Sequence, residues 1–138
     1  MIPLLTCLAF VLSVPDMSPI EDAIWAVESN RCQSGCPKGD SQNARGPLQI
    51  WRGAWSDCKR NDETYEMCES LEYSLKIFRR YCERYLTVKR LGRVATDEDR
   101  AKLWNGGPNF FRTKSQKKLD NLARYWAKVK KELDENEG

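Results

Sequence analysis

The segment of residues 30–46 constrains the fold most, because it interrupts a chain whose other parts follow helical spacing. Its turn-favouring residues are Gly35, Pro37, Gly39, Asn43 and Gly46. Since no hydrophobic period holds across this segment, we expect a loop with a short hairpin. The chain is therefore predicted to be mainly α, in the α+β class, with about five helices and one small irregular β-hairpin.

Capping residues mark where helices begin. Ser18, followed by Pro19 and by Glu21 three residues on, predicts a helix that opens with a capping box. Thr96, followed by three acidic residues, predicts the start of a second helix. We expect this helix to end at the Asn-Gly-Gly-Pro of residues 105–108. Further helices are predicted at residues 50–58, 65–86 and 115–136.

Residues 2–14 form an almost uninterrupted apolar run at the N-terminus. The run is too short to span a membrane and resembles the apolar part of a signal peptide, although no Lys or Arg precedes it. We expect residues 1–17 to be a signal peptide, cleaved between Ser13 and Ser18, and residues 18–138 to be one secreted domain. The alternative is a buried N-terminal strand or helix.

One of the six cysteines lies in this run, which leaves an odd number in the mature chain. Cys58 and Cys68 bracket a polar loop, so a local disulfide is plausible there. Cys32 and Cys36 are close enough in sequence to close a second small loop, which leaves Cys82 unpaired. The chain contains no His and no Cys-x-x-Cys pair, so we expect no metal site.

Two carboxylates stand out around the turn-rich segment. Glu28 lies one helical turn after Ile24, at the flank of the apolar stripe, and Trp25 precedes it by three residues. Partial burial there favours a protonated carboxyl, as a general acid needs. The alternative is an ordinary exposed Glu in the last turn of a helix. Asp40 follows twelve residues later, where it can equally be a turn residue bonded to its own backbone. Two carboxylates in different environments are the minimum equipment for hydrolysing a glycosidic bond.

The net charge of +3 and a pI of about 8.5 are only mildly basic. Such a surface suits capture of an acidic polymer such as a bacterial wall. It is too weak to indicate a nucleic-acid binder, and no aromatic–basic platform supports one. The C-terminal helix mixes acids with its lysines, which argues against insertion into a membrane.

Several short motifs, in this order, resemble those of the invertebrate-type lysozymes, which include the destabilases. They are Ala-Val-Glu-Ser at 26–29, Gly-Pro-Leu-Gln-Ile at 46–50, Trp-Ser-Asp-Cys at 55–58, the Tyr-x-x-Arg-Tyr element at 81–85, Trp-Asn-Gly-Gly-Pro at 104–108 and Tyr-Trp at 125–126. Each motif is weak alone, but together they cover nearly the whole mature chain.

This resemblance implies a lysozyme-like fold with no cofactor. It also implies a monomer that cleaves, with retention, the β-1,4 bond between N-acetylmuramic acid and N-acetylglucosamine in peptidoglycan. By the same resemblance Glu28 is the general acid/base, and Asp40 is the nucleophile on the hairpin. The residues expected to line the sugar groove are Gln49, Trp104, Asn105 and Gly106.

The chain also departs from the family. Relatives are usually richer in cysteine, and Trp104 stands where they have His. We do not carry over the isopeptidase activity of destabilases, because its His-dependent version is impossible in a chain without His. A rival interpretation is a non-catalytic peptidoglycan- or chitin-binding protein, or a cationic antimicrobial protein, with the same fold. A preference for chitin over peptidoglycan also stays open.

Overall fold

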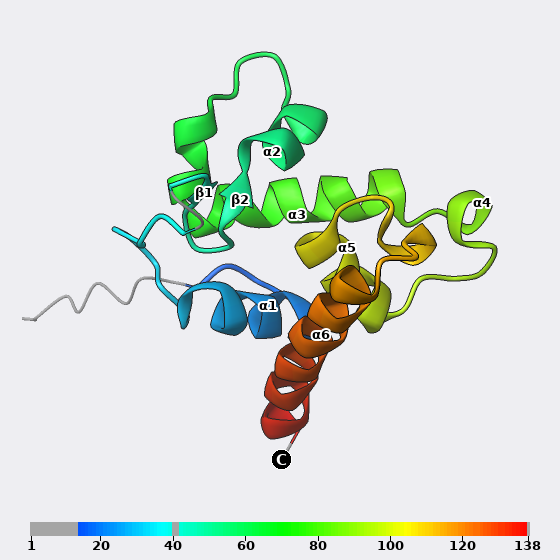
Figure 1. Ribbon diagram of the computed structural model, residues 1–138. Helices are drawn as coiled ribbons and strands as arrows, with labels where there is room; N and C mark the ends of the chain where they lie inside the picture. The colour runs from blue at the N-terminus through cyan, green and yellow to red at the C-terminus, as the bar shows by residue number, and fades with distance from the viewer. Residues whose placement is uncertain (1–13, 40–41, 138) are drawn as a thin grey trace, which may run out of the picture.

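Helix α3 (Leu71–Tyr85) runs through the middle of the fold, with the other elements arranged around it (Figure 1). This computed structural model describes residues 14–39 and 42–137. Most of the predicted signal peptide and Asp40 therefore lie outside the described residues. The predicted fold class is confirmed: the described chain is mostly helical and carries one two-stranded antiparallel sheet. None of its helices is long and apolar enough to cross a membrane.

The remaining elements follow in chain order. They are α1 (Pro19–Ser29), β1 (Ala44–Arg45), β2 (Ile50–Trp51), α2 (Arg52–Cys58), the 3-10 helix η1 (Tyr65–Glu69), α4 (Val88–Leu91), α5 (Asp97–Gly106), the 3-10 helix η2 (Phe110–Arg112) and α6 (Gln116–Asn136).

The predicted caps are present. The backbone N–H of Ser18 donates to the Glu21 carboxylate at 2.8 Å, and the Ser18 hydroxyl accepts from the Glu21 N–H, so α1 opens with the expected capping box. Thr96 and Asp99 make the same reciprocal pair at the start of α5. These local hydrogen bonds fix where both helices begin.

The single helix predicted over residues 65–86 is wrong, because it is broken at Ser70. That residue has extended backbone angles, and its hydroxyl accepts from the Tyr73 N–H to cap α3. The break makes room for the hairpin turn: Gly46 lies against the Cys68 carbonyl, where a Cβ would collide. With a φ of 80°, Gly46 also has a conformation that favours glycine.

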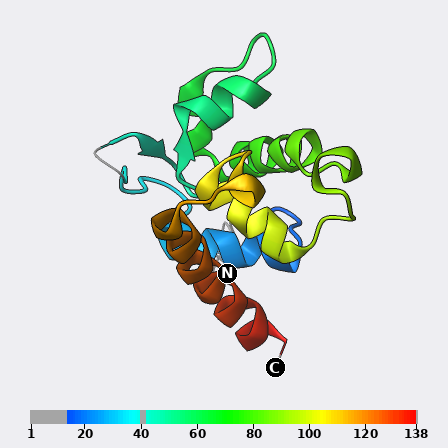
Figure 2. The same ribbon diagram turned by 45° about the vertical axis from the view of Figure 1, so that its right-hand side comes forward.

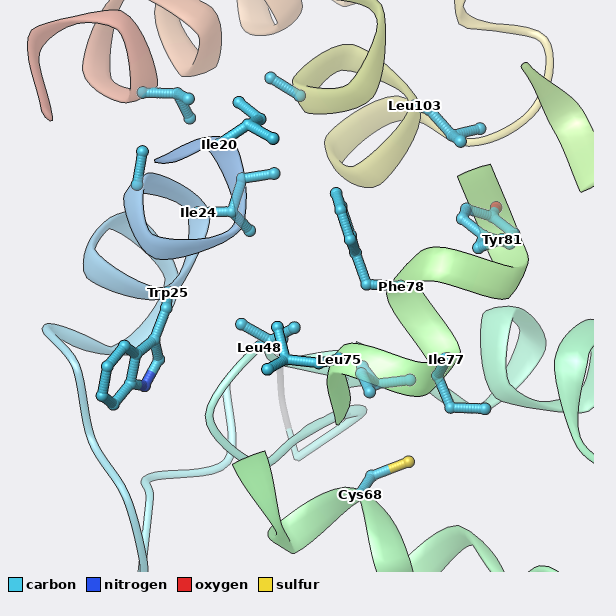
Figure 3. Close-up of a cluster of buried hydrophobic side chains, with 14 of the residues drawn as sticks. Ile20, Ile24, Trp25, Leu48, Cys68, Leu75, Ile77, Phe78, Tyr81 and Leu103 are labelled. Carbon is cyan, nitrogen blue, oxygen red and sulfur yellow. The ribbon is translucent and has the colours of Figure 1, made fainter. Parts of the chain in front are cut away.

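The core lies where α1, α3, α5 and α6 meet the hairpin turn. Figure 3 shows Ile24 of α1, Leu48 of the turn, Leu75 of α3 and Leu103 of α5, all essentially inaccessible to solvent. Helix α6 packs across α1 and α5 (Figure 2). The hairpin itself is short, with Ala44 opposite Trp51 and Arg45 opposite Ile50. Its turn is anchored because Leu48 is buried among the helices.

The Cys32–Cys36 disulfide is present, as expected from their spacing. The Cys58–Cys68 disulfide is wrong, because both residues are buried free thiols. The Cys58 carbonyl accepts from Arg80, whereas the Cys68 carbonyl accepts from Ser74. Cys58 ends α2 and Cys68 lies in η1, and each is hydrogen-bonded to a different turn of α3. Cys82 is a free thiol, as predicted.

Candidate active site

Glu28 lies in the last turn of α1 and is half-buried, as its place at the flank of the apolar stripe predicted. The chain leaves the helix sharply after it, since Asn30 and Arg31 both have positive φ. The indole N–H of Trp25 donates to the Cys32 carbonyl at 2.8 Å and holds this exit in place. The end of α1 is therefore a rigid support for the Glu28 carboxylate.

Tyr125 of α6 lies close to Glu28. Its side chain is 8% exposed, and its hydroxyl has no hydrogen-bond partner among residues 14–39 and 42–137. Burial raises the pKa of Tyr125 well above its usual value, and the negative charge of Glu28 raises it further. The Glu28 carboxylate therefore lies within electrostatic reach of a buried phenol at the contact between α1 and α6.

The segment that leads to Asp40 is held by Gln49, although Asp40 itself is outside the described residues. The Gln49 amide oxygen accepts from the Gly39 N–H at 2.8 Å. The Gln49 amide nitrogen donates to the carbonyls of Pro37 at 2.7 Å and Gly46 at 2.9 Å. Gln49 was predicted to contact sugar, but its amide is engaged with the backbone on both sides, which indicates a supporting role.

A small pocket of about 200 Å³, here called the Trp104 pocket, brings together three of the predicted groove residues: Gln49, Trp104 and Asn105. The Trp104 indole donates to the Leu48 carbonyl at 3.0 Å. Its ring also packs edge-on against Phe78 of α3, with centroids 5.2 Å apart. Trp104 is thus a fixed wall that ties α5 to the hairpin turn.

Trp51 also lines the Trp104 pocket and was missed in the sequence analysis. It is 48% exposed, so part of its indole is accessible to a ligand, and aromatic rings offer apolar faces for such contacts. The available signal was its position, directly after the Gly-Pro-Leu-Gln-Ile motif.

A second, larger pocket of about 870 Å³ lies between α5, η2 and α6 and is here called the α5–α6 pocket. Asn105 and Gly106 both line it, and Asn105 also lines the Trp104 pocket, so the two pockets share this residue. Gly106 has a packing role as well, since a Cβ there would lie 2.5 Å from a methyl carbon of Leu122. Glu28 is not among the described residues that line either pocket. Tyr125 lines the larger one and lies within electrostatic reach of Glu28.

No known sequence-family profile matches the chain. Solved structures do match. A crystal structure of Tapes japonica lysozyme aligns with a TM-score of 0.62 and 23% identity, over 85% of this chain and 92% of the other. A crystal structure of Aeromonas hydrophila PliI in complex with Meretrix lusoria lysozyme aligns with a TM-score of 0.61 and 25% identity, over 78% of this chain and 88% of that one. The chain has the invertebrate lysozyme fold.

Within this lysozyme fold, the charged residues of the α5–α6 pocket were also missed as site residues. The pocket carries four cations, Arg112 of η2 and Lys118, Arg124 and Lys128 of α6. The sequence analysis considered the lysines of the C-terminal helix only with respect to membrane insertion. Only the packing of α6 against α5 brings them to one concave surface.

Proposed function

We propose that this chain is a secreted lysozyme that hydrolyses the β-1,4 bond between N-acetylmuramic acid and N-acetylglucosamine in bacterial peptidoglycan. One observation carries the proposal. In an invertebrate lysozyme fold, a half-buried glutamate stands at the rigid end of α1, beside a buried phenol that lines a large pocket.

In the proposed mechanism, Glu28 protonates the leaving oxygen while ionised Asp40 attacks the anomeric carbon. A glycosyl–Asp40 ester forms, and the leaving sugar departs. Glu28 then removes a proton from water, which attacks the same carbon, releases Asp40 and regenerates the acid. Two displacements give net retention at the anomeric carbon.

We propose that Asn105 and the exposed Trp51 contact the sugar rings, since Trp51 lines the Trp104 pocket and Asn105 lines both pockets. Gln49 then serves this site by holding Pro37 and Gly39, on the approach to Asp40. No cofactor enters the scheme, and peptidoglycan is the proposed partner of a monomer.

For secretion, we propose that residues 1–17 include a signal peptide that is cleaved after Ser13. Residues beyond that point contact the domain: Met17 packs against the core, and the Asp16 carbonyl accepts from Arg79 at 2.9 Å. Cleavage after Ser13 keeps both contacts, whereas cleavage just before Ser18 removes them. N-terminal sequencing of the secreted protein distinguishes the two sites.

Digestion of purified peptidoglycan tests the enzymatic proposal. The wild-type protein should release soluble fragments, and Glu28→Gln and Asp40→Asn should each lower the rate by roughly 10²–10⁴-fold, the usual contribution of such groups. Glu83→Gln and Asp62→Asn are matched controls, because both acids are exposed and line neither pocket. The controls should retain the wild-type rate.

The rival functions give different results in the same assay. A folded wild-type protein that binds the wall without cutting it would be a binding module. Killing of bacteria that survives Glu28→Gln would indicate a cationic antimicrobial protein. Faster cleavage of chitin oligosaccharides than of peptidoglycan would reassign the substrate while keeping the mechanism.

A further inference from the structure

The α5–α6 pocket has the charge and chemistry of an anion-binding site. Its four cations are all exposed, and none forms an ion pair with a described residue. No Asp or Glu is among the described residues that line the pocket. Unpaired cations around one concavity attract a negatively charged ligand.

Two of these cations are held in position. Arg124 donates to the side-chain oxygen of Asn121 at 2.8 Å, and the guanidinium of Arg112 lies 4.8 Å from the centre of the Phe111 ring. Arginine binds carboxylates through two parallel hydrogen bonds when its fork is oriented. The pocket is thus partly preorganised for a carboxylate.

The rest of the lining suits a peptide better than a bare phosphate. Asn105, Asn109 and Asn121 supply carboxamides, which both donate and accept as peptide groups require. Phe110 and Leu122 supply an apolar floor for small side chains.

The dimensions agree with a short extended peptide. Lys118 and Lys128 lie ten residues apart on the pocket side of α6, which is about 15 Å along a helix. A peptide of four or five residues reaches about that length when extended. Asn105 lines both this pocket and the Trp104 pocket, and Tyr125 of this pocket lies within electrostatic reach of Glu28, so the pocket adjoins the candidate active site.

We propose that the α5–α6 pocket binds the carboxylate-bearing peptide that peptidoglycan carries on its muramic acid residues. This inference rests on the proposed function, since it specifies the substrate of that site. The pocket selects glycan that bears peptides, and neutral chitin leaves its cations unused.

The test measures binding rather than turnover. The pocket variant is the double substitution Lys118→Gln/Lys128→Gln. The control variant, Lys130→Gln/Lys131→Gln, removes the same charge from exposed positions of α6 outside this pocket. All proteins carry Glu28→Gln to prevent hydrolysis, and thermal unfolding checks that each is folded. The probes are a soluble disaccharide-tetrapeptide from peptidoglycan and the same disaccharide without its peptide.

We expect the pocket variant to bind the peptide-bearing probe about fivefold to tenfold more weakly, as for the loss of two partly exposed ion pairs. Binding of the peptide-free probe should change by less than about twofold, as should binding of both probes by the control variant. Equal losses for both probes, or for both variants, would overturn the proposal, because they indicate unspecific electrostatic attraction.

Two further arms separate the alternatives. If the pocket variant weakens binding only to walls that keep their phosphate-bearing polymers, the ligand is a phosphate and the peptide assignment is wrong. The other result is that the wild type fails to cut peptidoglycan while the pocket variant still shows weaker binding to the peptide-bearing probe alone. In that case the enzymatic proposal fails and the peptide site stands.

Discussion

Gln49 accepts a hydrogen bond from the Gly39 N–H at 2.8 Å and so joins the hairpin turn to the segment that leads to Asp40. A Cβ at Gly39 would lie 2.5 Å from that same amide oxygen, so a larger residue there would displace the Gln49 amide. Gln49 therefore holds the backbone of this segment, and its contact with sugar stays a prediction.

Replacing Gln49 with alanine should destabilise this loop. Three hydrogen bonds are lost at once, so the free energy of unfolding should fall by about 1–3 kcal/mol in urea titration. If Asp40 is the nucleophile, the rate on peptidoglycan should fall while the affinity for glycan changes little. Gln33→Ala, at an exposed position, is the control. If the Gln49→Ala variant bound glycan more weakly and kept its stability, Gln49 would be shown to contact sugar directly.

Acid should weaken the attachment of the loop after α2 to α3. Arg80 donates two hydrogen bonds to Glu63, at 2.6 and 3.1 Å. These bonds are the main cause that lowers the pKa of Glu63 from 4.5 to about 2. Burial opposes this shift, and hydrogen bonds from the Arg60 N–H and the Tyr73 hydroxyl add to it. Because the folded pKa is the lower one, this stabilisation is complete above about pH 4.5 and disappears as the pH falls toward 2.

Glu63→Gln tests that linkage. The variant should be less stable than the wild type by at most about 3 kcal/mol at pH 7, and the difference should nearly vanish at pH 2. Urea unfolding at several pH values measures it, with the exposed Glu83→Gln as control. A difference that stays constant with pH would show that the Glu63 charge contributes nothing.

Removing the Tyr125 hydroxyl should not destabilise the protein. A buried hydroxyl without a partner costs about 1–3 kcal/mol, so Tyr125→Phe should leave stability unchanged or raise it by about 1 kcal/mol. Tyr65→Phe is the matched comparison, because the buried Tyr65 hydroxyl donates to the Ile50 carbonyl at 2.5 Å. That variant should lose about 1–2 kcal/mol. Equal thermal shifts for both would contradict this difference.

The three free thiols should be unreactive in the folded protein. Burial raises the pKa of Cys58 to about 11 and of Cys68 and Cys82 to about 12. At pH 8 a disulfide reagent should therefore modify them about a hundredfold or more slowly than in the unfolded chain. Titration in denaturant should find all three in the mature chain, with Cys32 and Cys36 still oxidised. If only one thiol reacted after unfolding, the disulfide between Cys58 and Cys68 predicted from the sequence would be present after all.

Local chemistry accounts for the features that could be predicted from the sequence. The caps at Ser18 and Thr96 depend on residues three positions away, so they can be read directly from the chain. The position of Glu28 at the flank of α1 follows from helical period alone. The Cys32–Cys36 disulfide spans a separation of only four residues.

Tertiary packing decided the rest. The break at Ser70 accompanies the close approach of Gly46 to the Cys68 carbonyl, which no local pattern encodes. Cys58 at the end of α2 and Cys68 in η1 are both buried free thiols, which their local sequence does not reveal. The α5–α6 pocket arises from residues of η2 and α6 that become neighbours only when the helices pack.

The central claim is that this chain cuts the muramic acid–glucosamine bond, and the identity of the new reducing end tests it most directly. Purified peptidoglycan is digested, the soluble fragments are reduced with borohydride, and mass spectrometry identifies the reduced sugar. The account predicts muramitol at the new ends with the wild type and none with Glu28→Gln. Reduced glucosamine at those ends, or no fragments from a folded wild-type protein, would contradict it.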